Sequence, residues 1–294
     1  MNQTIDLQRS FATAVSRRRR TTDRVMTVLV CGAFLLALIP LISVTLTVVM
    51  NGIKRFSPYF LSVSMRGVYG GMDAGGIYHA ILGTLLITGM ATLISVPIGI
   101  LTAVYLVEYG GGRVARVITF LVDVMTGIPS IVAGLFAYSL FTMLFGPAIR
   151  IGVMGAVALS VLMTPVVIRS SEEMLRLVPN ELREASYALG VPKWLTIIKV
   201  VLRTSLAGIV TGVMIAIARV MGETAPLLVT VGVIDSINAN LVSGRMMTLP
   251  VFVYRQFHQG LVPCQPSDVA CVATINYDRA WAAALTLILI VMLL

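Results

Sequence analysis

Two charged residues stand close together inside a stretch of the sequence that is otherwise apolar. Residues 217–228 read IARVMGETAPLL, and the two charges are Arg219 and Glu223. In a helix, the i,i+4 spacing places both side chains on one face, where they can form an ion pair. A guanidinium group binds an oxyanion through parallel N–H donors and keeps its proton, while a nearby carboxylate limits the affinity so that the anion can leave. The pair therefore indicates a pathway for an anion.

The composition of the chain places this pair in a membrane. The chain has 294 residues, of which 57% are hydrophobic and only 12% are charged, against about 25% charged in a typical soluble domain. An arginine at the centre of a membrane helix costs on the order of 2.5–3.5 kcal/mol, so we expect this charge to have a function. The alternative is structural: Arg219 and Glu223 neutralise each other, or each pairs with a neighbouring helix.

Six apolar runs are candidates for membrane spans, which need roughly 20 residues. They cover residues 25–50, 79–107, 117–145, 151–168, 205–234 and 279–294. We therefore predict an all-α, polytopic membrane protein with six transmembrane helices. Its predicted parts are an N-terminal arm (1–24), a first helix (25–50), an outer loop (51–78) and a transmembrane domain (79–294).

Lysine and arginine positions predict the orientation of these helices. With the N-terminus in the cytoplasm, 14 of the 22 basic residues lie on the inner side and 7 on the outer side, as the positive-inside rule requires. Both termini are then cytoplasmic. The four arginines at 17–20 are interpreted as a topological and lipid anchor rather than a nucleic-acid site. The first run is longer than a signal-peptide core and lacks an A-x-A-like site, so we predict an uncleaved helix.

Two of the three cysteines fall in the predicted outer loop 235–278. Cys264 and Cys271 lie on the oxidising side of the membrane, where a disulfide can form; two unpaired thiols are the alternative. Cys31 lies in the first helix and is interpreted as a packing residue. No metal site is predicted, because the two histidines belong to no ligand-spaced cluster.

The predicted inner segment 170–203 carries an amphipathic pattern. Charged and apolar residues alternate at helical spacing over 179–189, a turn follows at Gly190, and the pattern resumes at Lys193. A helix lying on the lipid surface is one interpretation. The mixture of acids and bases on its polar face fits docking to a cytoplasmic protein better than an anionic membrane.

This segment resembles a sequence motif of a known protein family. Glu184, Ala185 and Ser186, followed by Gly190 and then by VVLR at 200–203, resemble the EAA loop of binding-protein-dependent permeases of ATP-binding-cassette (ABC) importers. Ser186 replaces the second alanine of that motif, and Val200 and Arg203 replace its isoleucine and proline. The resemblance implies that Glu184, Ala185 and Gly190 belong to a coupling helix that docks on an ATPase subunit.

Two further stretches resemble the phosphate-specific subgroup of these permeases. They are GIPSIVAGLF at 127–136, with Asp123 just before it, and ARVMGETAPL at 218–227. The resemblance implies a type I importer permease fold in a bacterial cell membrane. It also adds Arg169, at the inner end of the fourth run, to Arg219 and Glu223 as a substrate-pathway residue. An ordinary basic boundary residue is the alternative for Arg169.

The resemblance also implies the partners. They are a homologous second permease chain, two ATPase subunits and an extracytoplasmic phosphate-binding protein, with inorganic phosphate as the substrate. The chain has no G-x-x-x-x-G-K-[ST] motif, so we expect no hydrolysis and no cofactor in this chain, with ATP and Mg bound by the ATPase subunits. Residues 110–112, three glycines, are interpreted as a tight turn.

Other function classes remain open from the sequence. A permease of the same fold could carry another oxyanion such as sulfate or molybdate. A secondary transporter in which Glu223 relays protons would need no ATPase, and the docking segment argues against it. A role in phosphate sensing is compatible with transport and leaves no mark in the sequence.

Overall fold

The computed structural model describes residues 17–265 and 270–294, and all regular secondary structure in these ranges is helical. This confirms the predicted all-α class. An isolated antiparallel bridge joins Met72 to Cys271. Residues 1–16 of the predicted N-terminal arm lie outside the described ranges. The chain divides into two units, residues 1–50 and 51–294.

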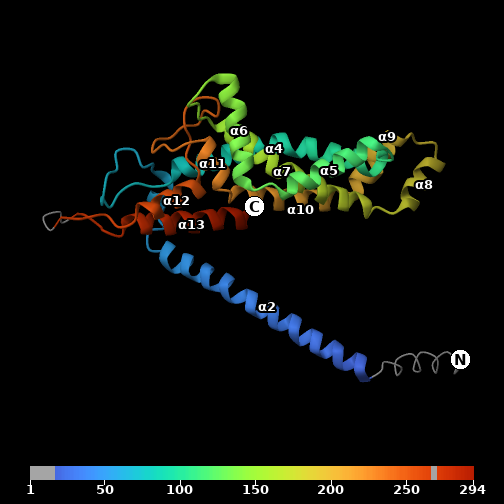
Figure 1. The fold of residues 1–294 in the computed structure, drawn as a ribbon, viewed down its shortest axis with the longest axis horizontal. Coiled ribbons are helices and arrows are strands. Elements are labelled where there is room, and N and C mark those ends of the chain that lie inside the picture. Colours follow the sequence, from blue (N-terminus) through green and yellow to red (C-terminus); the bar gives the residue numbers. More distant parts are fainter. Residues whose placement is uncertain (1–16, 266–269) are drawn as a thin grey trace. The chain divides into compact units, whose positions relative to one another are not determined.

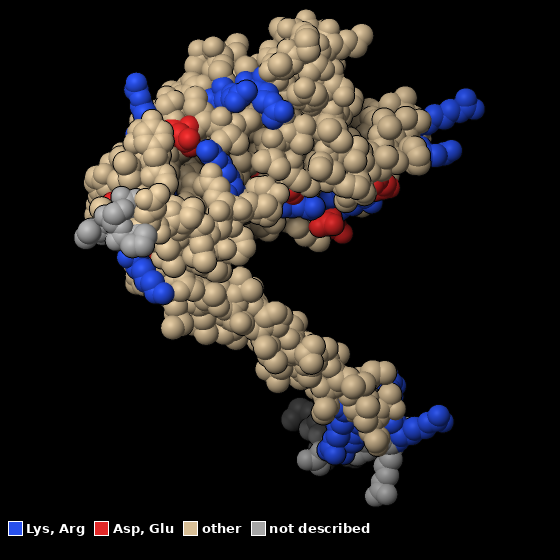
Figure 2. All heavy atoms as spheres, turned by 60° about the vertical axis from the view of Figure 1, so that its left-hand side comes forward, with Lys and Arg blue, Asp and Glu red and all other residues tan. Residues whose placement is uncertain are grey.

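The first unit is described by one long helix, α2 (Arg17–Gly52), which has 36 residues. At 1.5 Å per residue the helix is about 54 Å long, more than the roughly 30 Å of a membrane's hydrocarbon core. Most of its apolar side chains are exposed; Leu36, for example, is 71% exposed. Basic side chains surround its N-terminal end (Figure 2), where Arg18, Arg19 and Arg20 lie. α2 thus has the surface of a lipid-embedded span with a basic anchor.

Three long helices form the centre of the second unit and run side by side in Figure 1: α4 (Tyr78–Val104), α7 (Gly152–Arg176) and α10 (Leu202–Met221). Small residues let them approach closely, as membrane helices commonly do. A Cβ atom on Gly99 would lie 2.6 Å from Cγ1 of Val167. The core contains fully buried residues of these helices, among them Ile87, Ala91, Leu159, Met163, Val167 and Ala216.

The predicted span 117–145 is not one helix, which corrects the sequence prediction. α5 (Arg113–Gly127) and α6 (Ser130–Phe145) are bent by 108° from each other. The break lies at Ile128, which has φ −70° and ψ 128°. The ring of Pro129 clashes with a helical residue before it, so it drives Ile128 into the extended region.

Within residues 17–265 and 270–294, five helices are long and apolar enough to cross a membrane, and the bent pair would make a sixth. They are Arg18–Gly52, Tyr78–Tyr109, Gly152–Arg176, Lys193–Met221 and Ile275–Leu293. The prediction of six spans agrees with this range, although two of the predicted spans are broken.

The remaining helices are short, except for α13, and two of them lie in segments predicted as loops. α3 lies within 51–78, and α12 lies within 235–278 and packs against α13. The bounds are α3 Pro58–Ser62, η1 Tyr105–Tyr109 (a π-helical turn), α8 Asn180–Ala188, α9 Lys193–Thr196, η2 Ile197–Val201 (also π-helical), α11 Ala225–Thr230, α12 Leu249–Gln259 and α13 Ile275–Leu293.

Candidate substrate pathway and coupling segment

The helix is interrupted between Arg219 and Glu223, so the predicted continuous helix over 205–234 is wrong. α10 ends at Met221, and α11 begins at Ala225 with a proline in its first turn. Glu223 therefore lies outside both helices. Gly222 caps α10, because its N–H donates to the carbonyl of Arg219 at 3.3 Å. Glycine disfavours continued helix, and Pro226 suits the first turn of a new one, which explains the position of the break.

This break removes the geometry on which the predicted Arg219–Glu223 pair depended. Within the described part of the chain, the two side chains form no ion pair with each other or with any other residue. Arg219 is exposed in the last turn of α10, and Glu223 is half-buried. The structure thus gives no support to mutual neutralisation as the reason for these charges.

The two stretches singled out around these residues meet in space. α6, which carries residues 130–136 of the first stretch, packs on α11, which carries Pro226 of the second. A Cβ atom on Gly134 would lie 2.6 Å from Cα of Pro226. The absence of a side chain at Gly134 is therefore what allows the two backbones to touch beside the break.

Arg169 lies on α7 in a different electrostatic environment. Its guanidinium group donates to Asp123 of α5 and, at 2.8 Å, to Glu172 of its own helix. The Glu172 side chain is only 8% exposed and also accepts from Arg176 at 2.6 Å. Arg169 is therefore an arginine held by two carboxylates. The sequence analysis named Asp123 and missed Glu172.

The three glycines at 110–112 lie next to this ion-pair cluster. They line a hollow of about 530 Å³ together with Arg116, Asp123 and Glu172. Gly111 donates its N–H to the carbonyl of Tyr109 at 2.8 Å, which agrees with a tight turn. The structure brings Arg169 and these carboxylates together, while Arg219 shares no ion-pair partner with them among the described residues.

The predicted coupling segment forms two short helices joined by a turn. α8 ends at Ala188, Gly190 has φ +75°, and α9 begins at Lys193. Positive φ favours glycine, because a side chain clashes with the backbone there. The hydroxyl groups of Ser186 and Thr196 lie 2.8 Å apart across the turn. Ser186, which replaces the second alanine of the EAA motif, thus links α8 to α9 through its hydroxyl group.

The outward face of α8 mixes charged and apolar side chains. Glu184 and Ala185 are exposed, and so are Leu182 at 42%, Tyr187 at 41% and Leu189 at 84%. Figure 1 shows α8 at one extremity of the second unit, at the opposite end from α12. Apolar side chains exposed in this way are typical of a surface that binds another protein.

A buried ion pair fixes this segment to the rest of the second unit. Arg183 of α8 lies 3.0 Å from the carboxylate of Glu108 in η1, and the two side chains are 12% and 6% exposed. The same guanidinium group donates to the carbonyls of Val178 at 2.5 Å and Leu175 at 3.0 Å. α8 is therefore attached to the ends of both α4 and α7. The sequence analysis missed this contact, because Glu108 and Arg183 lie 75 positions apart.

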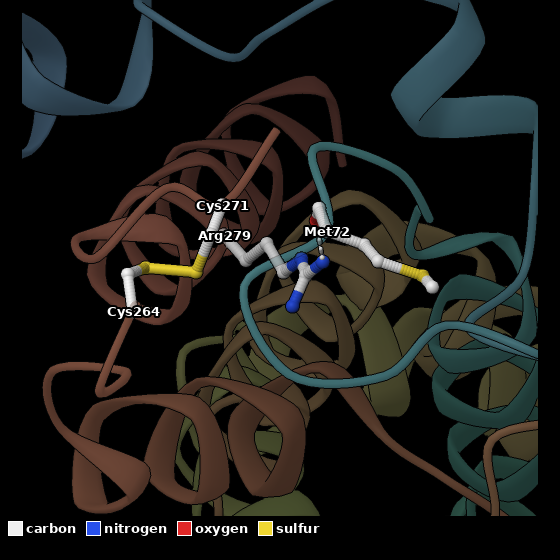
Figure 3. The surroundings of a disulfide bond; sticks show 4 residues. All are labelled: Met72, Cys264, Cys271 and Arg279. Carbon is white, nitrogen blue, oxygen red and sulfur yellow. Dashed lines mark hydrogen bonds between the residues drawn. A yellow bond between two sulfur atoms is a disulfide. The ribbon is translucent and has the colours of Figure 1, made fainter. Parts of the chain in front are cut away.

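The opposite end of the second unit carries the cysteines of the predicted outer loop. Cys264 and Cys271 form a disulfide (Figure 3), with their Cα atoms 5.7 Å apart. The disulfide lies against Gly71, where a Cβ atom would come within 2.2 Å of Sγ of Cys271. Arg279 at the start of α13 donates to the carbonyls of Met72 at 2.7 Å and of Ala74 at 2.9 Å. These contacts join the two predicted outer loops, which are far apart in the sequence.

Several curated proteins similar to this chain are named as phosphate transport system permeases. The chain is 47% identical to the phosphate transport system permease protein PstA 1 of Mycobacterium tuberculosis, over 93% of this chain and 86% of that protein. It is 45% identical to PstA of Mycobacterium leprae, over 94% and 87% of the two chains. It is also 37% identical to PstA of Pasteurella multocida, over 94% and 92%.

Solved structures with the same fold include two ABC transporters. A chain of the MetNI methionine ABC transporter in an inward-facing conformation matches with a TM-score of 0.53 and 21% identity, over 74% of this chain and 88% of that chain. A chain of a bacterial alginate ABC transporter, solved with its periplasmic protein, matches with a TM-score of 0.60 and 12% identity, over 94% and 93%. At these identities the likeness concerns the fold, which is that of a type I ABC importer permease.

The sequence also matches the model of a protein family over two thirds of its length. The model of the binding-protein-dependent transport system inner membrane component matches residues 95–294. These residues include the bent α5–α6 pair, Arg169, the coupling segment and the break beside Arg219. Together with identities of 37–47% over more than nine tenths of the sequence, this match shows that the chain belongs to the family of binding-protein-dependent transport system inner membrane components.

Proposed function

We propose that this chain is the transmembrane permease subunit of an ATP-driven importer of inorganic phosphate. The observation that carries the proposal is the 47% identity, over 93% of the chain, to proteins named phosphate transport system permease PstA 1. In the complex, the chain forms half of the translocation pathway and pairs with a homologous PstC-type permease. It receives phosphate from an extracytoplasmic PstS-type binding protein.

The coupling segment binds an ATPase subunit of the PstB type, of which the complex has two. Exposed apolar residues on α8, the positive φ of Gly190 and the buried Glu108–Arg183 ion pair support this role. The exposed face can dock, and the ion pair transmits its displacement to α4 and α7 because both helices contact Arg183 through η1 or backbone carbonyls. The chain itself is non-catalytic, and ATP and Mg bind to the partner.

Arg219 faces the substrate pathway at the surface that the second permease covers. It is exposed in the mostly apolar second half of α10 and has no ion-pair partner among the described residues. A lipid-facing arginine costs on the order of 2.5–3.5 kcal/mol, so a protein interface or a hydrated path is the favourable surrounding. Glu223 lies at the break, where unwound backbone can line such a path. Arg169 contributes a second cation at the end of α7 next to the coupling segment.

The proposed function includes an orientation in the bacterial plasma membrane. The end with α8 and α9 is cytoplasmic, as is the basic N-terminal end of α2, and the disulfide end faces the oxidising exterior. The C-terminus is also assigned to the cytoplasm.

The experiment that tests the function is ATP hydrolysis by the complex reconstituted in lipid, with binding protein supplied in phosphate-loaded and unloaded forms. We expect phosphate-loaded protein to stimulate hydrolysis and to drive accumulation of phosphate in the vesicles. Stimulation by sulfate or molybdate in place of phosphate would contradict the substrate. Uptake driven by a pH gradient without ATP would contradict the importer class.

A further inference from the structure

A polar pocket of about 600 Å³ lies at the disulfide end of the second unit, separate from the residues assigned to the pathway. Its charged lining consists of Arg66, Asp235, Arg255 and Arg279. Asp235 accepts from Arg255 at 2.7 Å and 3.4 Å, so these two charges balance each other. Arg66 and Arg279 remain as positive charges without a carboxylate partner among the described residues.

Arg279 is the unusual member of this lining, because it is a buried cation without a counter-ion. It is 2% exposed, and its Nη atoms donate to backbone carbonyls and weakly to Asn276. Its Nε atom has no hydrogen-bond acceptor within the described chain. Asp73 lies nearby but pairs with Arg55 instead. A buried charge left without a partner is costly, and an anion bound beside it would offset that cost.

Gln256 adds a second buried group whose bonding is incomplete. It lines the same pocket, is 2% exposed, and its Oε1 atom accepts no hydrogen bond from any described residue. An anion that only accepts hydrogen bonds would satisfy Arg279 and leave Oε1 without a donor. An anion that carries a proton can satisfy both, since it accepts from the guanidinium group and donates to the amide oxygen.

We propose that this pocket binds a small protonated oxyanion of the phosphate class, with Arg66 and Arg279 as cationic donors and Gln256 as the acceptor for its proton. Phosphate keeps a proton near neutral pH, whereas sulfate does not. The pocket lies at the end of the second unit that carries the disulfide, which the proposed orientation assigns to the exterior. The ligand class rests on the proposed function, but binding at this site is measured without transport.

The test is a thiol-protection measurement on the full-length chain in lipid nanodiscs. Ser236 lines the pocket and is half-buried. It is replaced by cysteine in a Cys31→Ser background, which removes the free thiol found in the structure. We expect inorganic phosphate to slow labelling by a neutral maleimide severalfold and saturably, while chloride at equal ionic strength does not. No slowing, or equal slowing by chloride, would overturn the site.

Three variants link the protection to the named residues. Arg66→Gln changes an exposed side chain, so folding is retained, and it should weaken protection by phosphate. Gln256→Glu introduces a negative charge into the pocket that Arg279 also lines, and should abolish protection. Lys54→Gln removes the same charge from another exposed position of the outer loop that does not line the pocket, and protection should persist. Unchanged protection in both pocket variants would exclude these residues.

Three outcomes distinguish the role of Gln256, the pocket and the proposed transport function. Protection by sulfate as strong as by phosphate would overturn the role of Gln256 as a proton acceptor. Phosphate-driven ATP hydrolysis together with an unprotected Ser236→Cys would leave the transport function in place and reject the pocket. Saturable protection in a complex that fails to transport would support the pocket and reject the function.

Discussion

The two candidate pathway arginines occupy opposite electrostatic environments. Arg169 is held by Asp123 and by the buried carboxylate of Glu172, within a cluster that also includes Arg176. Arg219 stands exposed at the end of α10, with no ion-pair partner among the described residues and beside a break in the backbone. A paired arginine fixes helices to each other, whereas an unpaired one is available to a ligand or a partner chain. The comparison shows that Arg169 also links α5 to α7, whereas Arg219 remains available for the proposed contact with substrate.

Replacing a glutamate by glutamine in each of these two regions should give the largest difference in stability between variants. Glu172→Gln removes a buried charge that two arginines share, and the loss of hydrogen bonds to charged groups should cost roughly 2–3 kcal/mol. Glu223→Gln changes a half-buried residue without an ion pair, and should change stability by less than about 0.5 kcal/mol. The midpoint of thermal unfolding of the detergent-solubilised chain measures both. Equal shifts would break the comparison.

A smaller effect is expected where α6 and α11 meet beside the break. Gly134→Ala places a Cβ atom 2.6 Å from Cα of Pro226, and overpacking of this kind should cost about 1–2 kcal/mol. Gly127→Ala is the matched control, because a Cβ atom there meets nothing within 4 Å. The unfolding midpoint should fall for the first variant and not for the second. A shift in the control alone would contradict the contact.

Coupling to the ATPase subunit should be weakened by a substitution in the turn between α8 and α9, with Arg169 and Arg219 left unchanged. Gly190→Ala meets no atom within 4 Å but must adopt φ +75°, a conformation that costs about 1–2 kcal/mol for alanine. We expect weaker binding of the ATPase subunit and lower stimulated hydrolysis in the reconstituted complex. Gly89→Ala, in open space on α4 without positive φ, is the control. Full stimulation in Gly190→Ala would remove the turn from the coupling segment.

Local patterns in the sequence predicted the parts that depend on local chemistry. The amphipathic spacing over 179–189 and the glycine at 190 predicted α8 and its turn, because positive φ and helical periodicity are properties of neighbouring residues. The apolar runs likewise predicted the long spans. The disulfide is also a short-range feature, with a sequence separation of 7.

Features that depend on distant contacts were not predictable in this way. Asp123 and Arg169 are 46 positions apart, and no periodicity indicates that α5 and α7 bring them together. The 108° bend escaped prediction because the apolar run continues across Pro129, and membrane helices tolerate an internal proline. The break at 222–224 was not predicted either, since membrane helices tolerate glycine and proline.

The central claim is that Arg219 contacts the transported anion, and phosphate uptake per assembled complex tests it most directly. Arg219→Lys keeps the charge but loses the bidentate donor geometry, so uptake should fall by about tenfold or more, which corresponds to roughly 1.4 kcal/mol, while assembly is unchanged. Glu223→Gln should alter uptake by tightening the hold on the anion. Uptake at the wild-type level in both variants, normalised to assembled complex, would contradict the account.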